Sequence, residues 1–165
     1  MRLKAHSNHN LKGHLYRNFQ IKLTTYLKVG RRPKGSLNAK GRRPKAKMKL
    51  AIVGSRNYHN YEEFKQNILN ILTVDNLSIG EIISGGASGA DKLAERFAAE
   101  YQIPIKVFKP EWKKYGKAAG PLRNQQIIEE CTHVIAFPSV QGKGTQDSIR
   151  KAQLLGKPIK IIYID

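Results

Sequence analysis

From residue 48 onward, short apolar runs alternate with segments of helical periodicity, and this alternation restricts the fold more than any other feature. A short apolar run bounded by Gly or Pro predicts a buried strand, whereas apolar residues spaced three and four apart predict one face of a helix. Because strands that alternate with helices pair in parallel, residues 48–165 are predicted to form an α/β domain, a mostly parallel sheet of about five strands with helices on both faces. The predicted strands are Lys49–Val53, Glu81–Ser84, Ile103–Phe108, Thr132–Phe137 and Ile159–Ile164.

Residues 1–47 have a different composition and are predicted to form a separate, largely extended basic arm. Half of the chain's 30 lysines and arginines lie in residues 1–50, and the first acidic residue is Glu62. A block of like charge repels itself and attracts polyanions, so nucleic acid is the expected partner of the arm. A solvated tail and an organellar transit peptide are the alternative interpretations. Residues Phe19–Val29 alternate apolar and polar side chains, which predicts a short strand that must pair with something else to be stable.

Two similar units in the arm, Gly30–Lys34 and Gly41–Lys45, both read Gly-Arg-Arg-Pro-Lys. Proline and glycine prevent a regular helix, so each unit is expected to be extended and to suit a groove of nucleic acid. The units resemble AT-hook motifs, although the AT-hook core reads Arg-Gly-Arg-Pro; a non-specific DNA- or RNA-binding arm is the plainer interpretation. The predicted nucleic-acid-binding residues are Arg31, Arg32, Lys34, Arg42, Arg43, Lys45 and Lys47.

The single cysteine, the short apolar runs and the spacing of the histidines exclude several classes of protein. Cys131 is the only cysteine, which precludes an intrachain disulfide and fits a reducing compartment. No apolar run has the roughly 18 residues that a membrane helix needs, so no membrane association is predicted. His6, His9 and His14 lack cysteine partners and a recognised ligand spacing, so neither a metal site nor a cofactor is predicted.

Two glycine-containing loops follow predicted strands at the edge where parallel sheets bind ligands, outside the carboxyl ends of the strands. Gly54-Ser55-Arg56 permits a sharp exit from the first strand and offers a bidentate cation. Ser84–Asp91 carries three glycines, and the helix after it would direct free N–H groups toward a phosphate. Ordinary structural turns are the alternative for both loops. Predicted ligand-binding residues here are Gly54, Ser55, Arg56, Gly85, Gly86, Ser88, Gly89 and Asp91.

Two later segments are expected to reach the same edge. Trp112–Asn124 is predicted to be a long basic loop over an anion, in which the aromatic rings either stack on a base or pack on the rim of the core. Gly142–Thr145 precedes a helix for which Thr145 is the expected N-cap. The ligand-binding residues predicted in these segments are Trp112, Lys117, Arg123, Asn124, Gly144 and Thr145.

Taken in this order, the four loops resemble the SLOG superfamily, in particular its YspA/YpsA-related branch. The matching stretches are Ile52–Arg56, Ser84–Asp91, Trp112–Asn124 and Ala136–Thr145, so the resemblance covers nearly all of residues 48–165 and none of the arm. The resemblance implies a Rossmann-like fold and a nucleotide or nucleotide-derived ligand. The superfamily includes LOG phosphoribohydrolases and the DNA-processing protein DprA. Proteins of this branch occur in bacteria and their phages, which implies the cytoplasm of a bacterial or phage-infected cell.

The stretch that matches the phosphoribohydrolases departs from them at the catalytic position. Those enzymes read Gly-Gly-x-Gly-Thr-x-x-Glu, whereas here Ser148 stands in place of the glutamate. Asp147 lies one residue earlier, about 100° around a helix, and would face elsewhere. The candidate catalytic carboxylates are therefore Asp91, Glu111 and Asp147, and the sequence requires none of them.

Three functions are consistent with these features. The first is a module that binds a nucleotide-like ligand while the arm tethers it to nucleic acid. The second is an enzyme that processes a nucleotide, for example by N-glycosidic hydrolysis. The third is a structural or assembly protein of a virion or ribonucleoprotein. A homo-oligomer is possible under each of them.

Overall fold

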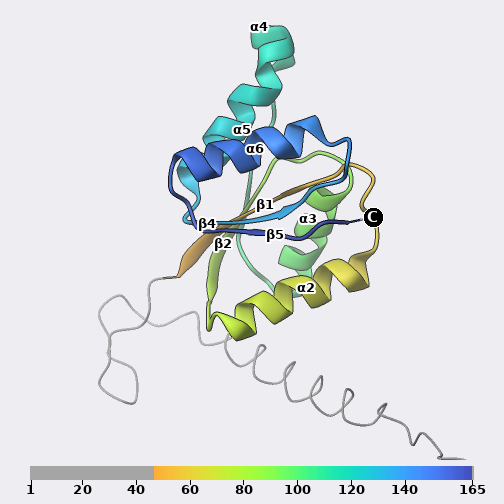
Figure 1. The fold of residues 1–165 in the computed structure, drawn as a ribbon, viewed down its shortest axis with the longest axis vertical. Coiled ribbons are helices and arrows are strands. Elements are labelled where there is room, and N and C mark those ends of the chain that lie inside the picture. The colour runs from red at the N-terminus through yellow and green to blue at the C-terminus, as the bar shows by residue number, and fades with distance from the viewer. Residues whose placement is uncertain (1–46, 165) are drawn as a thin grey trace, which may run out of the picture. The chain divides into compact units, whose positions relative to one another are not determined.

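The computed structural model describes residues 47–164, and five parallel strands run through their centre (Figure 1). The sheet order is β3-β2-β1-β4-β5, and every neighbouring pair is parallel. This confirms the predicted α/β class with a parallel sheet. The strands are β1 Met48–Gly54, β2 Ile79–Ser84, β3 Ile105–Val107, β4 His133–Phe137 and β5 Ile159–Ile161.

Helices cover both faces of the sheet, with α2 and α3 on one face and α5 and α6 on the other (Figure 1). Asn60 caps the beginning of α2, since its side chain accepts a hydrogen bond from the backbone N–H of Glu63. The helical segments are α2 Tyr61–Val74, α3 Ala90–Glu100, α4 Trp112–Tyr115, η1 Gly116–Ala118, α5 Ala119–Glu130 and α6 Lys143–Leu154.

The long basic loop predicted over Trp112–Asn124 is wrong, because this segment is helical throughout. Gly116, with φ at +48°, ends α4 and turns the chain into the short 3-10 helix η1. Pro121 falls in the first turn of α5, where its missing N–H would have no helical acceptor. Glycine and proline therefore separate consecutive helices here.

The core lies between the sheet and its two helix layers. Phe64 of α2, Phe97 of α3 and Phe137 of β4 are fully buried, and the ring centroids of Phe64 and Phe137 are 5.1 Å apart. On the α5–α6 face, Ile127 and Ile128 pack against the central strands. The central strands β1, β2 and β4 thus contribute the buried apolar residues of the sheet, whereas the residues of the edge strands β3 and β5 are half-buried or exposed.

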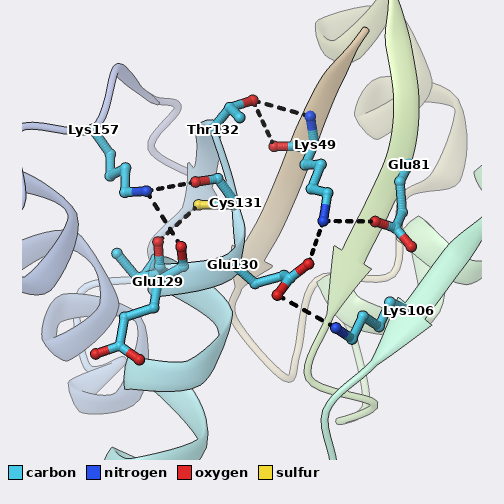
Figure 2. Close-up of polar contacts among 9 residues, drawn as sticks. Lys49, Glu81, Lys106, Glu129, Glu130, Cys131, Thr132 and Lys157 are labelled. Carbon is cyan, nitrogen blue, oxygen red and sulfur yellow. Dashed lines mark hydrogen bonds and ion pairs between the residues drawn. The ribbon is translucent and has the colours of Figure 1, made fainter.

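An ion-pair network fastens the amino-terminal edge of the sheet (Figure 2). Lys49 of β1 pairs with Glu130 at the end of α5 and, at 3.6 Å, with Glu81 of β2. Glu130 also pairs with Lys106 of β3 at 3.4 Å. Because these side chains are substantially exposed, the network orients the strand ends and adds little to stability.

Several predictions concern residues outside the described range. They include the strand at Phe19–Val29, both Gly-Arg-Arg-Pro-Lys units and the three histidines before residue 15. Of the predicted nucleic-acid-binding residues, Lys47 belongs to the described part, where it is exposed just before β1. Within residues 47–164, no helix is both long enough and apolar enough to cross a membrane.

Candidate functional site

A cavity of about 360 Å³ opens at the carboxyl ends of β1 and β4. The chain continues from β1 to β2 and β3 on one side, and β4 and β5 lie on the other, so this is the switch point of the sheet. Loops diverge at such a point and leave a crevice in which open α/β sheets bind ligands. The cavity is lined by Val53, Gly54, Ser55, Arg56, Asn57, Ala87, Asp91, Arg123, Asn124, Ile127, Ser139, Gln141, Gly142, Lys143, Gly144, Thr145 and Ser148.

The first turn of α6 supplies backbone donors to this cavity. The four N–H groups at the start of a helix have no acceptor within the helix. The N–H of Gly142 donates to the Ser139 carbonyl at 3.2 Å, and that of Lys143 donates to the Gln141 carbonyl at 3.0 Å. The N–H groups of Gly144 and Thr145 have no hydrogen-bond acceptor within residues 47–164, and both residues line the cavity. Together with the positive end of the helix dipole, they form an arrangement suited to an anion.

Three cationic side chains, those of Arg56, Arg123 and Lys143, line the cavity. Arg123 is held in place by a hydrogen bond to the Gly85 carbonyl and an ion pair of 3.8 Å with Asp91. Burial lowers the pKa of Arg123, Asp91 raises it and nearby Arg56 lowers it again. The Arg123 Nε atom is buried and has no partner within 47–164. Positive charge is therefore concentrated here, and part of it is fixed by the fold.

Asp91 is the one carboxylate that lines the cavity in the described part of the chain. Its Oδ2 accepts a hydrogen bond of 3.0 Å from the N–H of Ala87 and faces Arg123. Burial raises the pKa of Asp91, while the Ala87 N–H and Arg123 act in the opposite direction. Asp91 therefore braces the loop after β2 and positions Arg123.

Contacts within the protein account for two glycines of the Ser84–Asp91 loop. A Cβ at Gly85 would lie 1.7 Å from Nη1 of Arg123, so that residue must lack a side chain for the guanidinium to dock. At Gly89, φ is +71° and a Cβ would lie 2.2 Å from the backbone oxygen of Ser55. That same oxygen accepts the N–H of Ala90, the first residue of α3. The first turn of α3 therefore packs on the loop after β1, whereas the first turn of α6 offers backbone N–H donors to the cavity.

A polar bridge between α5 and α6 fixes the far wall of the cavity. The Asn124 Nδ2 group donates to the Gly144 carbonyl at 3.3 Å and to Oδ2 of Asp147 at 3.0 Å. Asp147 also pairs with Lys151 and Arg150 along α6. Burial would raise the pKa of Asp147, but the hydrogen bonds from Lys151, Asn124 and Arg150 together lower it.

The cavity brings together some of the residues predicted from sequence and leaves others outside its lining. Glu111 and Asp147, two of the candidate carboxylates, lie outside it. Eight predicted ligand-binding residues line it: Gly54, Ser55, Arg56, Asp91, Arg123, Asn124, Gly144 and Thr145. Six do not: Gly85, Gly86, Ser88, Gly89, Trp112 and Lys117.

Sequence reasoning overlooked several lining residues and misplaced one cap. The predicted N-cap at Thr145 is wrong, because α6 begins at Lys143 with Gly142 as its cap and Thr145 is buried in the first turn. Parallel sheets bind ligands outside the carboxyl ends of their strands, so every residue between β4 and α6 could have been predicted as a ligand-binding candidate. The overlooked lining residues with polar side chains are Asn57, Ser139, Gln141, Lys143 and Ser148.

Comparison with known proteins places the chain among SLOG proteins. Residues 48–115 match the model of the YspA, cpYpsA-related SLOG family, called YAcAr. The chain is 33% identical over 84 residues to the Gene 61 protein of Mycobacterium phage D29, an alignment that covers 47% of this chain and 67% of that protein.

Two solved structures resemble the fold. DNA processing protein A (DprA) from Streptococcus pneumoniae superposes with a TM-score of 0.56 at 21% identity, over 72% of this chain and 51% of that chain. The chain thus spans about half the length of the DprA structure. The structural-genomics target TM1055 superposes with a TM-score of 0.47 at 19% identity, over 68% of this chain and 72% of that chain.

Proposed function

Because this chain belongs to the YspA, cpYpsA-related SLOG family, we propose that its α/β unit binds a phosphate-bearing nucleotide or nucleotide derivative in the cavity between β1 and α6. We propose further that the basic arm binds nucleic acid without sequence preference, which tethers the ligand-binding unit to it. Residues 1–47 are rich in lysine and arginine and contain no acidic residue, and this composition supports the second part.

One observation carries the first part: backbone donors and cations from distant segments converge on one cavity. Gly144 and Thr145 provide amides at the start of a 12-residue helix, Arg56 follows β1, and Arg123 comes from α5. A phosphate accepts several hydrogen bonds at once and carries the charge that these groups complement. The cavity volume of about 360 Å³ falls in the range of small-molecule sites.

A nucleotide hydrolase is the second candidate, and the position of Asp91 is the observation that favours it. A buried carboxyl with a raised pKa that lines a cavity is a common feature of acid–base catalysts. Against this, the carboxylate is engaged by the Ala87 N–H and Arg123. Ser148, where the phosphoribohydrolases carry glutamate, donates to the Gly144 carbonyl at 3.3 Å and cannot act as a carboxylate. Binding without turnover is therefore the function that the geometry supports best.

The test of ligand binding is thermal unfolding of the full chain against ADP-ribose, NAD and nucleoside monophosphates. A ligand at a hundredfold its Kd stabilises the folded state by about 2.7 kcal/mol, which is an easily measured shift. Arg56→Ala is expected to abolish the shift, whereas Arg150→Ala removes an equal charge from α6 outside the cavity and should retain it. If no compound raises the melting temperature of the protein, the cavity is not a nucleotide site.

Turnover is then assayed with the compound that binds. Release of free base from that compound, abolished by Asp91→Asn, would establish the hydrolase. Full binding without product supports the binding module.

The arm is tested by the salt dependence of oligonucleotide binding. Replacing Arg31, Arg32, Arg42 and Arg43 by alanine removes four cations, which should lower the slope of log K against log salt by about 3 to 4 on duplex DNA. The effect should be equal on unrelated sequences. A loss confined to one sequence would contradict non-specific binding.

A further inference from the structure

Two large aromatic side chains are exposed on α4. Trp112 is 53% exposed and Tyr115 is 42% exposed. They are three residues apart in one helical turn, and this spacing places side chains on the same face. Neither ring lines the cavity described above, and no residue of α4 is buried. These rings therefore form a surface of their own.

The fold presents this surface away from the sheet. Figure 1 shows α4 extending beyond the helix layer that α5 and α6 form. The helix packs on η1 and on the first turn of α5, where a Cβ at Gly120 would lie 3.5 Å from Cη2 of Trp112. Trp112 therefore packs against Gly120 of α5 on one side, and about half of its surface remains exposed.

Positive charge surrounds the rings. Lys109, Lys113, Lys114 and Lys117 are exposed, and Glu111 is the one acidic residue between positions 109 and 117. The Nζ atom of Lys114 lies 3.8 Å from Oε2 of Glu111 and 4.7 Å from the centroid of the Tyr115 ring. Lys113 and Lys117 have no ion pair within residues 47–164.

We propose that this surface, which we call the α4 platform and define as Trp112, Lys113, Lys114, Tyr115 and Lys117, binds single-stranded nucleic acid. The two rings stack on unpaired bases and the lysines neutralise the adjoining phosphates. Exposed aromatics interleaved with cations are the combination by which single strands are bound without sequence preference. This site goes beyond the proposed function, which places the nucleotide in the cavity and the other nucleic-acid contacts on the arm.

The chemistry of the platform favours a single strand over two other polyanionic surfaces. The bases of a duplex are already stacked on one another, so their faces are closed to protein rings. An anionic membrane would be bound by an amphipathic helix with a broad apolar face. The helix α4 has four residues and carries no aliphatic side chain.

Trp112 is the only tryptophan of the chain, so its fluorescence reports on the platform even when the arm also binds. The full chain is titrated with a short oligothymidylate, and binding is followed in parallel by the anisotropy of a label on the oligonucleotide. Stacking on Trp112 should quench its emission in step with the anisotropy change. A duplex of equal length should bind through the arm with little quenching.

Variants separate stacking from charge. Tyr115→Ala should weaken oligothymidylate binding about tenfold, the typical effect of removing one stacking ring, and leave duplex binding unchanged. Neutralising Lys113, Lys114 and Lys117 with glutamine should lower the salt slope on the single strand by about 2. Lys92→Gln and Lys160→Gln replace exposed lysines outside the platform and serve as a control for loss of positive charge elsewhere. Circular dichroism checks that each variant is folded.

Three results would overturn the proposal. The first is saturation of the anisotropy signal with no change in Trp112 emission, which would assign all binding to the arm. The second is equal quenching by duplex and single strand. The third is a blue shift of Trp112 on vesicles of anionic phospholipid in the absence of any response to oligothymidylate, which would assign the platform to membranes.

Discussion

Replacing Arg123 by methionine tests whether the fold itself fixes the charge of the cavity. Methionine keeps much of the apolar stem but removes the guanidinium. The variant loses the charge-assisted hydrogen bond to the Gly85 carbonyl and the ion pair with Asp91, whose Oδ2 keeps the hydrogen bond of 3.0 Å from the Ala87 N–H. Because the Arg123 side chain is 12% exposed and that of Asp91 is 9% exposed, water replaces these contacts poorly.

The expected cost is about 2 kcal/mol in the free energy of unfolding. A hydrogen bond to a charged group contributes about 1.5–3 kcal/mol, and a buried carboxylate deprived of its cation adds to the loss. Relief of the repulsion between Arg56 and Arg123 acts in the opposite direction. For a domain of about 120 residues, a loss of this size lowers the melting temperature by about 6–10 °C.

The cost must also depend on pH. Burial raises the pKa of Asp91 and Arg123 opposes that rise, so in the variant the pKa of Asp91 is higher still. A group whose pKa is raised by folding stabilises the fold at low pH, and this contribution is lost as the pH rises through the folded-state value. The difference between variant and parent should therefore be largest near neutral pH and smaller in acid, where Asp91 is protonated.

The assay is urea denaturation of four proteins at about pH 7.5 and about pH 4.5: the parent, Arg123→Met, Asp91→Asn and the double variant. The cost of Arg123→Met should fall by about 1 kcal/mol or more in the Asp91→Asn background. An equal cost in both backgrounds and at both pH values would refute the pairing of Arg123 with Asp91 as the source of the stability.

Two further predictions concern the loops and α6. Gly89→Ala should lower the free energy of unfolding by more than about 2 kcal/mol, because φ is +71° and the Ser55 oxygen blocks the new methyl group. At Gly144 the new methyl group meets no atom within 4 Å, so Gly144→Ala should change stability by less than about 0.5 kcal/mol. Equal effects of the two variants in thermal unfolding would contradict the packing argument. The contacts of Asp147 lower its pKa, so they stabilise the fold above the unfolded-state pKa and are lost as the pH falls through the folded-state value. Asp147→Asn should lower stability at neutral pH by about 1 kcal/mol and flatten the acid limb of the pH profile in urea denaturation; an unchanged acid limb would show that other carboxyls dominate it.

The strands were predictable because each is a short apolar run that ends at a polar or glycine-containing turn. Their order in the sheet was not, because it depends on which side each crossover passes. The segment after Trp112 was misjudged for a local reason: its glycines suggest a loop, yet Gly116 ends α4 and Gly120 lies in the first turn of α5. The same residue types mark loops and helix boundaries, and their position relative to the helix decides which.

The glycines of the Ser84–Asp91 loop show a different limit. Absence of a Cβ permits close approach, but the sequence does not specify what approaches. In the structure Gly85 makes room for Arg123 and Gly89 for the β1 loop, and both partners are distant in sequence. Arg56 could be predicted because it follows the first strand at the ligand-binding edge, and Arg123 because it lies in a basic segment expected to reach that edge. The brace formed by Asn124 and Asp147 depends on how α5 and α6 pack, which no local pattern encodes.

Of the two arginines that line the cavity within residues 47–164, Arg123 is held in place by the fold and Arg56 is not. This difference determines how variants of each should behave. Arg123 is held by Gly85 and Asp91, so removing it should reduce both stability and ligand affinity. Arg56 is exposed, so a bound phosphate would have to order it, and its removal should reduce affinity while leaving the unliganded protein as stable as before. Under the proposed function the two arginines would contribute differently to the binding free energy. Arg123 is already in position before a ligand binds, whereas Arg56 would gain its partner from the ligand.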